Sequence, residues 1–372
     1  MNDNEPRRAA VAIILRILPP PDYPLPISSG PSNLADFFKL DWVNAKESRA
    51  EILFIHRRKG DISEINRSSK EAHVAFPGGR MEEGDEGGHY TAMRQTWEEI
   101  GLDLAEKDFI CVGQLDDREI TTSLGKRLLM ILSPFVFLQV TPNSISVDPP
   151  PETTIHWIPL SKLVRQRSIW SYVTVDVASR LTPKHSWVKI LVRILVGSMQ
   201  FSAIILNASW KRSDQNKNEK SQVDHNQVLK LWGLTLGMTL DLLACMPDSF
   251  SPSEKAPGSP TDYAFTPHPI DTEHAINLAM TPSLTSVFPR FSYPDVNFWI
   301  WVFGKRYREV VRGWEASVQS GGSNDKRINW AGTALNTFYA AVRKALVVVI
   351  ILRALGVLLA LGVGSWWLWG IS

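Results

Sequence analysis

The sequence has few of the features that mark secreted or nucleic-acid-binding proteins. Only two cysteines, Cys111 and Cys245, occur among the 372 residues. Neither a disulfide framework nor a zinc site built on cysteines is therefore expected, and a reducing compartment is favoured. Lysine and arginine exceed aspartate and glutamate by only two, for a formal net charge of +2. Such a balance gives no general attraction to nucleic acid, and we expect no nucleic-acid partner.

A targeting signal is not expected at the N-terminus either. The apolar run within residues 1–18 is short, follows the acids Asp3 and Glu5, and is interrupted by Arg16. Its β-branched content predicts a buried first strand, and residues 50–57 predict the next one. Prolines cluster after the first strand and end its regular structure, so we interpret residues 19–48 as an insertion that is either ordered or flexible.

The most informative stretch runs from residue 76 to 104 and joins a Pro-Gly-Gly turn, an acid-rich loop and a short amphipathic helix. Met93, Trp97 and Ile100 have the spacing of one helical face, which we expect to pack. Gly101 is expected to end the helix in a left-handed conformation. The other side of this helix carries Arg94, Gln95, Glu98 and Glu99.

These acids suggest a metal site. Magnesium and manganese ions prefer oxygen ligands, and acids close together on a helix can converge on one ion. Glu98 and Glu99 are the first candidates, with Glu82 and Asp85 from the preceding loop. The alternative is a solvated acidic helix face, which is the common interpretation of a lone pair of glutamates.

At these residues the sequence resembles the Nudix hydrolase family, whose motif runs from a glycine through an acid-rich loop to Arg-Glu and Glu-Glu-x-Gly. Gly79 and Gly101 stand at the two ends of the corresponding stretch. The resemblance implies an α/β/α sandwich with a mixed sheet and a pyrophosphohydrolase that uses Mg²⁺ or Mn²⁺. It implies that Arg94, Gln95, Glu98 and Glu99 stand at catalytic positions, and that Glu98, Glu99, Glu82 and Asp85 bind metal. Arg94 would hold the glutamates in place.

Two departures from the motif affect the function that it implies. The interval from Gly79 to Arg94 is one residue longer than usual, which resembles the coenzyme A pyrophosphatase branch and its fungal relatives. Gln95 occupies the position of a family glutamate, and an amide can neither take a proton nor neutralise a cation. Asp117 or Glu119, in a later loop, could replace that base.

Two later segments also resemble the coenzyme A pyrophosphatase branch. Residues 152–160 contain Trp157 in a Trp-Ile-Pro-Leu run, and Trp232 opens a Trp-Gly-Leu-Thr run. The substrate implied is a small diphosphate, with coenzyme A or acyl-coenzyme A as the first guess. The residues expected to bind it are Arg57, Arg67, Phe76, Gly78 and Gly79. The alternative is a catalytically weakened module, lacking the base at Gln95, that binds a nucleotide ligand or protein partner at a membrane.

The composition divides the chain into four parts. They are a Nudix domain over residues 1–248 with insertions at 19–48 and 211–226, a Pro/Ser/Thr-rich linker over 249–294, a basic aromatic juxtamembrane region over 295–344, and an apolar tail over 345–370. The tail has 26 residues with Arg353 as its one charge. About 20 apolar residues span a bilayer, so we predict a transmembrane tail anchor.

Arg343 and Lys344 precede the tail and predict that the catalytic domain faces the cytosol. A buried core helix and an in-plane amphipathic helix are the alternatives for the tail. The sequence leaves the target membrane open, with mitochondrion and peroxisome as candidates, and it does not indicate the oligomeric state.

Overall fold

The computed structural model describes most of the chain in segments. The described residues are 6–21, 23, 30–31, 33–58, 71–122, 127–142, 146–164, 170–176, 190, 194–195, 197–207, 228–244, 288–319 and 330–371. The strands are β1 (Arg7–Leu18), β2 (Arg49–Arg57), β3 (Glu71–His73), β4 (Gly78–Arg80), β5 (Phe109–Gln114), β6 (Arg118–Thr122), β7 (Arg127–Gln139), β8 (Thr153–Pro159), β9 (Trp170–Asp176), β10 (Ser198–Asn207), β11 (Val228–Trp232) and β12 (Arg290–Phe291). The helices are α1 (Leu34–Phe37), α2 (Asp41–Asn44), α3 (Gly88–Ile100), α4 (Leu160–Val164), α7 (Gly233–Ala244), α10 (Pro294–Phe303), α11 (Lys305–Gln319) and α12 (Trp330–Ile371).

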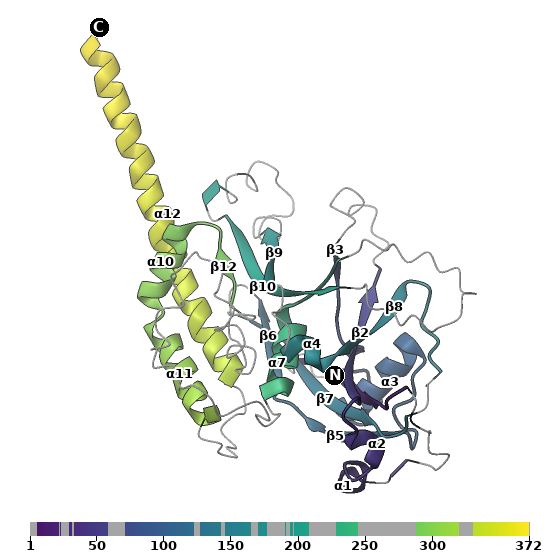
Figure 1. Cartoon of the computed structure of the whole chain (residues 1–372). Coiled ribbons are helices and arrows are strands. Elements are labelled where there is room, and N and C mark those ends of the chain that lie inside the picture. Colours follow the sequence, from purple (N-terminus) through teal and green to yellow (C-terminus); the bar gives the residue numbers. More distant parts are fainter. Residues whose placement is uncertain are drawn as a thin grey trace.

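Strand β1 lies at the centre of a seven-stranded mixed sheet (Figure 1). The order is β5-β7-β1-β2-β8, with β4 paired to β1 and β6 paired to β7. β1 runs parallel to β7 and antiparallel to β2 and β4. Residues 9–14 of β1 are all buried, as the apolar run of the sequence predicts for a strand covered on both faces.

The two faces of β1 pack against different helices. Ala10, Ala12 and Ile14 belong to the core cluster under α3, which Ala92 and Ile100 complete. The alternation of side chains along a strand sends the intervening residues of β1 to the opposite face.

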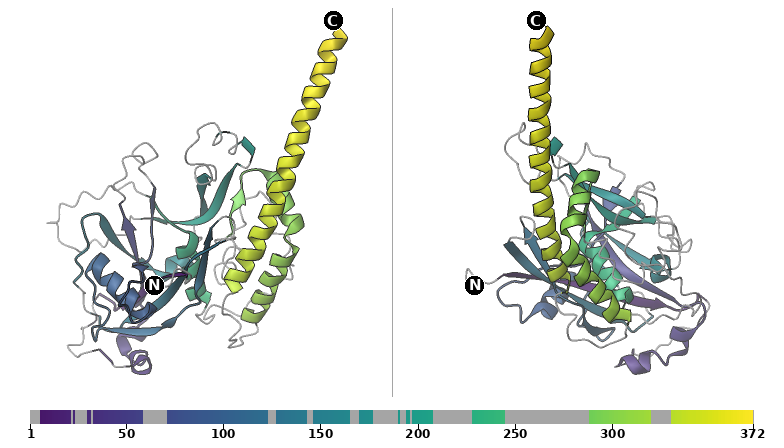
Figure 2. Two further views of the ribbon diagram at one scale, coloured as in Figure 1. Left: turned by 180° about the vertical axis from the view of Figure 1, so that it is seen from behind. Right: turned by 90° about the vertical axis from the view of Figure 1, so that its left-hand side faces the viewer.

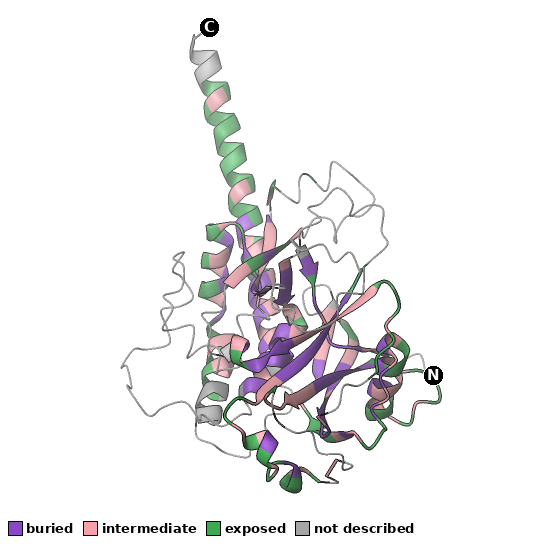
Figure 3. Ribbon diagram, turned by 45° about the vertical axis from the view of Figure 1, so that its right-hand side comes forward, coloured by how far each residue is buried: buried purple, intermediate pink, exposed green. Residues whose placement is uncertain are grey.

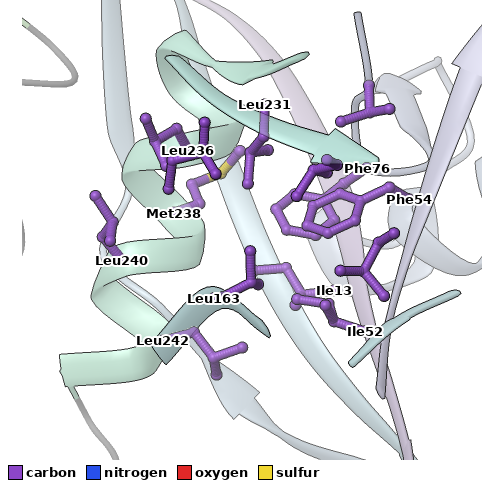
Figure 4. Close-up of a cluster of buried hydrophobic side chains, with 14 of the residues drawn as sticks. Ile13, Ile52, Phe54, Phe76, Leu163, Leu231, Leu236, Met238, Leu240 and Leu242 are labelled. Carbon is purple, nitrogen blue, oxygen red and sulfur yellow. The ribbon is translucent and has the colours of Figure 1, made fainter. Parts of the chain in front are cut away.

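On that opposite face, helix α7 and a second sheet cover the first. The second sheet has five strands in the order β12-β10-β11-β3, with β9 paired to β10. Ile13 and Phe54 meet Leu231 of β11 and Leu236 and Met238 of α7 in one core cluster (Figure 4). The predicted α/β/α arrangement with a mixed sheet is therefore confirmed, because the first sheet lies between α3 and this second layer.

A helical extension follows at the C-terminus. The first part of α12 packs against α10 and α11 and buries Phe338, Val342 and Val349. From Ile350 to Trp366 no residue of α12 is buried, and this part projects from the domain (Figures 2 and 3). Within the described residues, one helix is long and apolar enough to cross a membrane by length and composition, over Ala334–Trp366.

The described part of the insertion at 19–48 follows the ordered alternative. It contains the short helices α1 and α2, whose Phe37 and Trp42 form a small core with Leu138. Two other expectations need correction. Trp97 was expected on the packed face of α3, but its side chain is 57% exposed. The residues that α3 buries are Thr91, Ala92, Thr96 and Ile100. The predicted tail begins in the domain core, because Ala345 is buried.

Other predicted segments lie partly or wholly outside the described residues. This is true of the insertion at 211–226 and of residues 249–287 of the predicted linker. Phe291, within the last part of that linker, is buried and pairs through β12 with β10. The four-part division of the chain stays a prediction.

We predict that α7 stabilises the Nudix core, as the proposed boundary near residue 248 requires. Leu236→Ala should lower the free energy of unfolding by about 2–5 kcal/mol, because it leaves a cavity where the side chain is fully buried. Leu234→Ala is the matched control on the same helix, since Leu234 is 36% exposed, and should cost less than about 1 kcal/mol. Denaturant unfolding in detergent measures both values. If both substitutions lower the free energy of unfolding by the same small amount, α7 does not share a core with the central sheet.

Candidate active site

The glycine turn after Phe76 fits closely against the central strand. Gly78 has a φ of 147°, and a Cβ there would lie 2.3 Å from the carbonyl oxygen of Ala10. A Cβ on Gly79 would lie 2.1 Å from the side-chain oxygen of Gln95. Position 78 therefore requires glycine, because a side chain there would push β4 away from β1. A side chain at position 79 would instead displace the flexible amide of Gln95.

Phe76 anchors this turn from inside the protein. Its ring is 2% exposed and stacks on Phe54 with centroids 5.0 Å apart. Only its carbonyl oxygen approaches the site, at 3.5 Å from Nη2 of Arg57. The side chain of this predicted substrate-binding residue thus lies in the core.

Glu99 is held at the turn by three hydrogen bonds. Arg57, at the end of β2, donates from Nε and Nη2 to the two carboxylate oxygens at 2.6 and 2.8 Å. The backbone N–H of Gly78 donates to the same carboxylate at 2.9 Å. The structure thus brings together Arg57, Gly78 and Glu99 from three separate elements, and this charge-assisted pair fixes the orientation of Glu99.

A second arginine organises the acid-rich loop. Arg94 donates through Nε and Nη2 to both oxygens of Asp85, each at 2.8 Å, and through Nη1 to Glu98 at 2.9 Å. Asp85 also accepts from the Thr91 hydroxyl at 2.9 Å and from the backbone N–H of Glu82 at 3.0 Å. The loop is thereby tied to the first turn of α3.

Electrostatics at this cluster follow from these bonds. The Arg94 guanidinium holds the pKa of the Asp85 carboxyl well below its usual range. The Asp85 carboxylate in turn raises the pKa of Arg94. The ion pair therefore favours the charged form of both groups. Through its two bonds Asp85 fixes the position of the Arg94 guanidinium, and its expected place among the metal ligands stays a prediction.

Gln95 lies between the turn and Glu98. Its side-chain N–H donates to Glu98 at 3.1 Å, while its oxygen faces Gly79. A carboxylate at this position would repel Glu98 instead of bonding to it. The amide of Gln95 therefore binds Glu98 as a hydrogen-bond donor, which a carboxylate could not do.

The acids offer the right donor atoms for a metal, but they are partly engaged by arginines. Glu98 and Glu82 have side chains that are 50% and 66% exposed, and Glu99 presents carboxylate oxygens beside them on α3. An all-oxygen donor set fits Mg²⁺ or Mn²⁺. In the part of the chain that the structure describes, no cluster of three or more His, Cys, Asp or Glu side chains is already arranged around one point.

The remaining predicted residues are not all brought to this place. Arg67 lies outside the described residues. Asp117 accepts a hydrogen bond from Gln114 and lines a cavity of about 260 Å³ next to Gly88, the first residue of α3. Glu99 lies eleven positions after Gly88 on α3, roughly 16 Å at the rise of an α-helix. Glu119 belongs to β6, opposite Ile131. No described contact joins Asp117 or Glu119 to Glu99, and their role as a base stays a prediction.

Comparison with known protein families finds one matching domain. Residues 43–175 match the model of the NUDIX domain. The chain contains a Nudix domain. The matched residues run from α2 to β9 and include the glycine turn, α3 and both arginine clusters.

An uncharacterized protein of Schizosaccharomyces pombe is 29% identical over 209 residues, which cover 54% of this chain and 56% of that protein. The match thus spans little more than half of the relative's length. Among solved structures, the Nudix hydrolase RenU of M. smegmatis overlaps with a TM-score of 0.26 at 13% identity, covering 41% of this chain and 71% of that one. A C. elegans Ap4A hydrolase complex overlaps with a TM-score of 0.26 at 14% identity, covering 43% and 84%. The assignment of the Nudix domain rests on the family model and the strand topology.

We predict that Asp85 positions Arg94 and stabilises the acid-rich loop. Asp85→Asn should lower the unfolding free energy by about 1–3 kcal/mol near pH 7, because Arg94 loses its two-bond carboxylate partner. Glu86→Gln, at an exposed acid of the same loop, is the matched control and should change little.

The effect should also depend on pH with a defined sign. A depressed pKa contributes stability above the unfolded value of about 3.9, and this contribution is lost as the pH falls through the folded pKa. The difference between wild type and Asp85→Asn should therefore be constant from neutral pH down to about pH 5 and shrink below about pH 4. Thermal unfolding midpoints across this range measure it. Identical midpoints at pH 7 would show that the ion pair does not stabilise the loop.

Proposed function

We propose that the Nudix domain is a metal-dependent pyrophosphohydrolase acting on a nucleoside diphosphate linked to another moiety. The observation that carries the proposal is the fixed carboxylate of Glu99, which Arg57 and the Gly78 N–H hold at the glycine turn. Glu98 stands next to it on the same capped helix. Coenzyme A or acyl-coenzyme A is the first substrate class to test, because the motif spacing and the runs at Trp157 and Trp232 resemble that branch of the family.

The residues of the site suit recognition of a diphosphate. Once released from Glu99, the planar guanidinium of Arg57 can pair with two phosphate oxygens. The absence of side chains at Gly78 and Gly79 lets a phosphate approach the backbone of the turn closely. Arg94 keeps Glu98 oriented through their 2.9 Å bond. These groups would bind and orient the diphosphate for attack.

Mg²⁺ or Mn²⁺ would be held by Glu98 and Glu99, with Glu82 and Asp85 as further ligands. When bound, such an ion polarises the phosphoryl oxygens and lowers the pKa of a coordinated water. Asp85 would have to share its oxygens with Arg94, which occupies both of them. Glu99 would likewise have to share both of its oxygens with Arg57. Glu98 and Glu82, with side chains 50% and 66% exposed, are therefore the more accessible part of the proposed ligand set.

A second candidate function is supported by Gln95. Its amide is bonded to Glu98 and cannot accept a proton, and the Glu99 carboxylate is already neutralised by Arg57. Such a site suits a domain that binds a nucleotide ligand or a protein partner and hydrolyses slowly or not at all. Both candidates share the same binding groups and differ in turnover.

The two candidates can be separated at Gln95. The purified full chain should hydrolyse coenzyme A with Mg²⁺ or Mn²⁺, and Gln95→Glu should raise the rate on the order of 100-fold, because it restores a carboxylate able to take a proton. Gln95→Ala is the control for loss of the amide. Rates are measured over a panel of diphosphate-linked nucleotides.

Two results would change the interpretation. An unchanged rate in Gln95→Glu alongside active wild type would place the base elsewhere. If the wild-type protein turns over none of these compounds but still binds a ligand in calorimetry, the proposal of hydrolytic activity is wrong and the binding module is favoured.

The apolar end of α12 is proposed to anchor the domain in a membrane, with the Nudix domain on the cytosolic side. The structure suggests where to truncate, because Ala345 and Val349 are core residues whereas residues after Arg353 are not buried up to Trp366. Deleting residues 354–372 should move the protein from the membrane pellet to the soluble fraction while leaving its unfolding midpoint nearly unchanged. A deletion of 345–372 should release it too, but with a lower midpoint, since it removes two core residues. Retention of the 354–372 deletion on membranes would contradict the anchor.

A further inference from the structure

Arg353 ties the projecting helix to the domain at the point where α12 leaves it. Its guanidinium donates to Asp295 at 2.7 and 3.2 Å. It also donates to the backbone carbonyls of Leu195 at 2.6 Å and Ile194 at 3.1 Å. The ring of Tyr293 lies beneath it, with the guanidinium carbon 4.4 Å from the centroid. The one charge of the predicted tail is thus satisfied at the domain surface.

The length of helix beyond this arginine fixes where a bilayer can lie. Residues 354–370 are 17 in number, about 25 Å of helix at 1.5 Å per residue. The hydrocarbon core of a bilayer is about 30 Å thick. No loop separates the core residue Val349 from this segment, because α12 is one continuous helix. A bilayer crossed by α12 must therefore begin directly at the level of Arg353.

The segment bonded to Arg353 exposes apolar side chains at this level. Ile190 and Ile194 are helical in conformation and are 59% and 60% exposed. The surrounding sequence contains Trp187, Lys189 and Arg193, a composition typical of segments that lie in the interface of a membrane with anionic lipids.

We propose that Ile190 and Ile194 form a second membrane contact, inserted at the boundary between the headgroups and acyl chains of the bilayer that α12 crosses. The occupant of this surface is lipid, because the surface is joined through Arg353 to the lipid-crossing part of α12. The inference rests on the proposed membrane span and not on the proposed hydrolysis.

Two contacts with one membrane would set the orientation of the Nudix domain. α12 alone permits rotation of the domain about the helix axis, whereas a second contact beside the helix removes that freedom. Helix α3 lies on the side of the molecule away from the C-terminal end of α12 (Figure 1). The glycine turn and the acids of α3 would then stay open to the aqueous phase.

The depth of Ile194 can be measured in the full chain. Cys111 and Cys245 are replaced by serine, and a nitroxide is attached to Ile194→Cys in vesicles of phosphatidylcholine and phosphatidylserine. Accessibility to oxygen relative to a water-soluble nickel chelate reports depth. Leu358→Cys on α12, 65% exposed, is the membrane reference, and Phe38→Cys after α1, 55% exposed, is the aqueous reference. The ratio of oxygen accessibility to nickel-chelate accessibility at position 194 should be several-fold higher than at position 38 and lower than at position 358. Ile190→Cys gives a second measurement at the same level.

The outcomes separate the two proposals. If position 194 has the same accessibility ratio as the aqueous reference 38 while position 358 lies in the bilayer, the proposal of a second membrane contact is wrong and the proposed span stands. If position 358 has the accessibility ratio of a residue in water, both the proposed membrane span and the second contact are wrong. Low accessibility of 194 to both reagents, with a doubled particle mass, would show that a second copy covers the surface and would also overturn the proposal. None of these results depends on catalysis.

Discussion

The close approach of β4 to β1 at Gly78 is the contact on which the site depends. With no side chain between Gly78 and the Ala10 carbonyl, β4 can pair with the central strand. The same residue then presents its N–H to Glu99. A larger residue at this point would move the turn, and with it the only backbone group that binds the Glu99 carboxylate among the described contacts. The chemistry of the acids is therefore set by packing in the sheet beneath them.

The charges of the site balance locally. Arg57 and Arg94 each hold carboxylates in a fixed geometry, so the acidic face of α3 is pre-organised before any ligand binds. Under the proposed function, a cation or a phosphate would have to compete with these internal partners. Arg57 would pair with either Glu99 or the incoming anion, and it would thereby couple the state of the acids to the presence of a phosphate.

The sequence predicted secondary structure well where the spacing of apolar residues fitted either a strand or a helix, but not both. β1, β2 and the end of α3 at Gly101, with its left-handed φ of 66°, lie where the sequence placed them. Trp97 was placed wrongly because periodicity favours large apolar residues. The side of α3 that meets Ala10 and Ala12 instead carries the small residues Thr91, Ala92 and Thr96, which let the helix approach the sheet. Helix propensity does not reveal that the close approach of α3 to Ala10 and Ala12 of β1 requires small side chains on the helix.

The candidate site was predictable in its residue types but not in its pairing. Glu98 and Glu99 follow from the motif, whereas the pairing of Arg57 with Glu99 joins residues 42 positions apart and depends on how β2 meets α3. Likewise, Asp85 was expected as a ligand because carboxylates bind metals, and only the tertiary contact with Arg94 reveals its positioning role. Long-range charge pairing cannot be read from spacing along one helix.

The unbroken passage of α12 from a protein core into an apolar segment constrains the proposed membrane anchor. Such an anchor, beginning at a bound arginine, could not lengthen by sliding, since that would draw Arg353 from Asp295 into hydrocarbon. Hydrophobic mismatch would then be relieved by the lipid, which thins around a short helix at a cost that grows with bilayer thickness. Sorting by thickness would keep a protein anchored in this way out of thick, sterol-rich membranes and concentrate it in thinner ones.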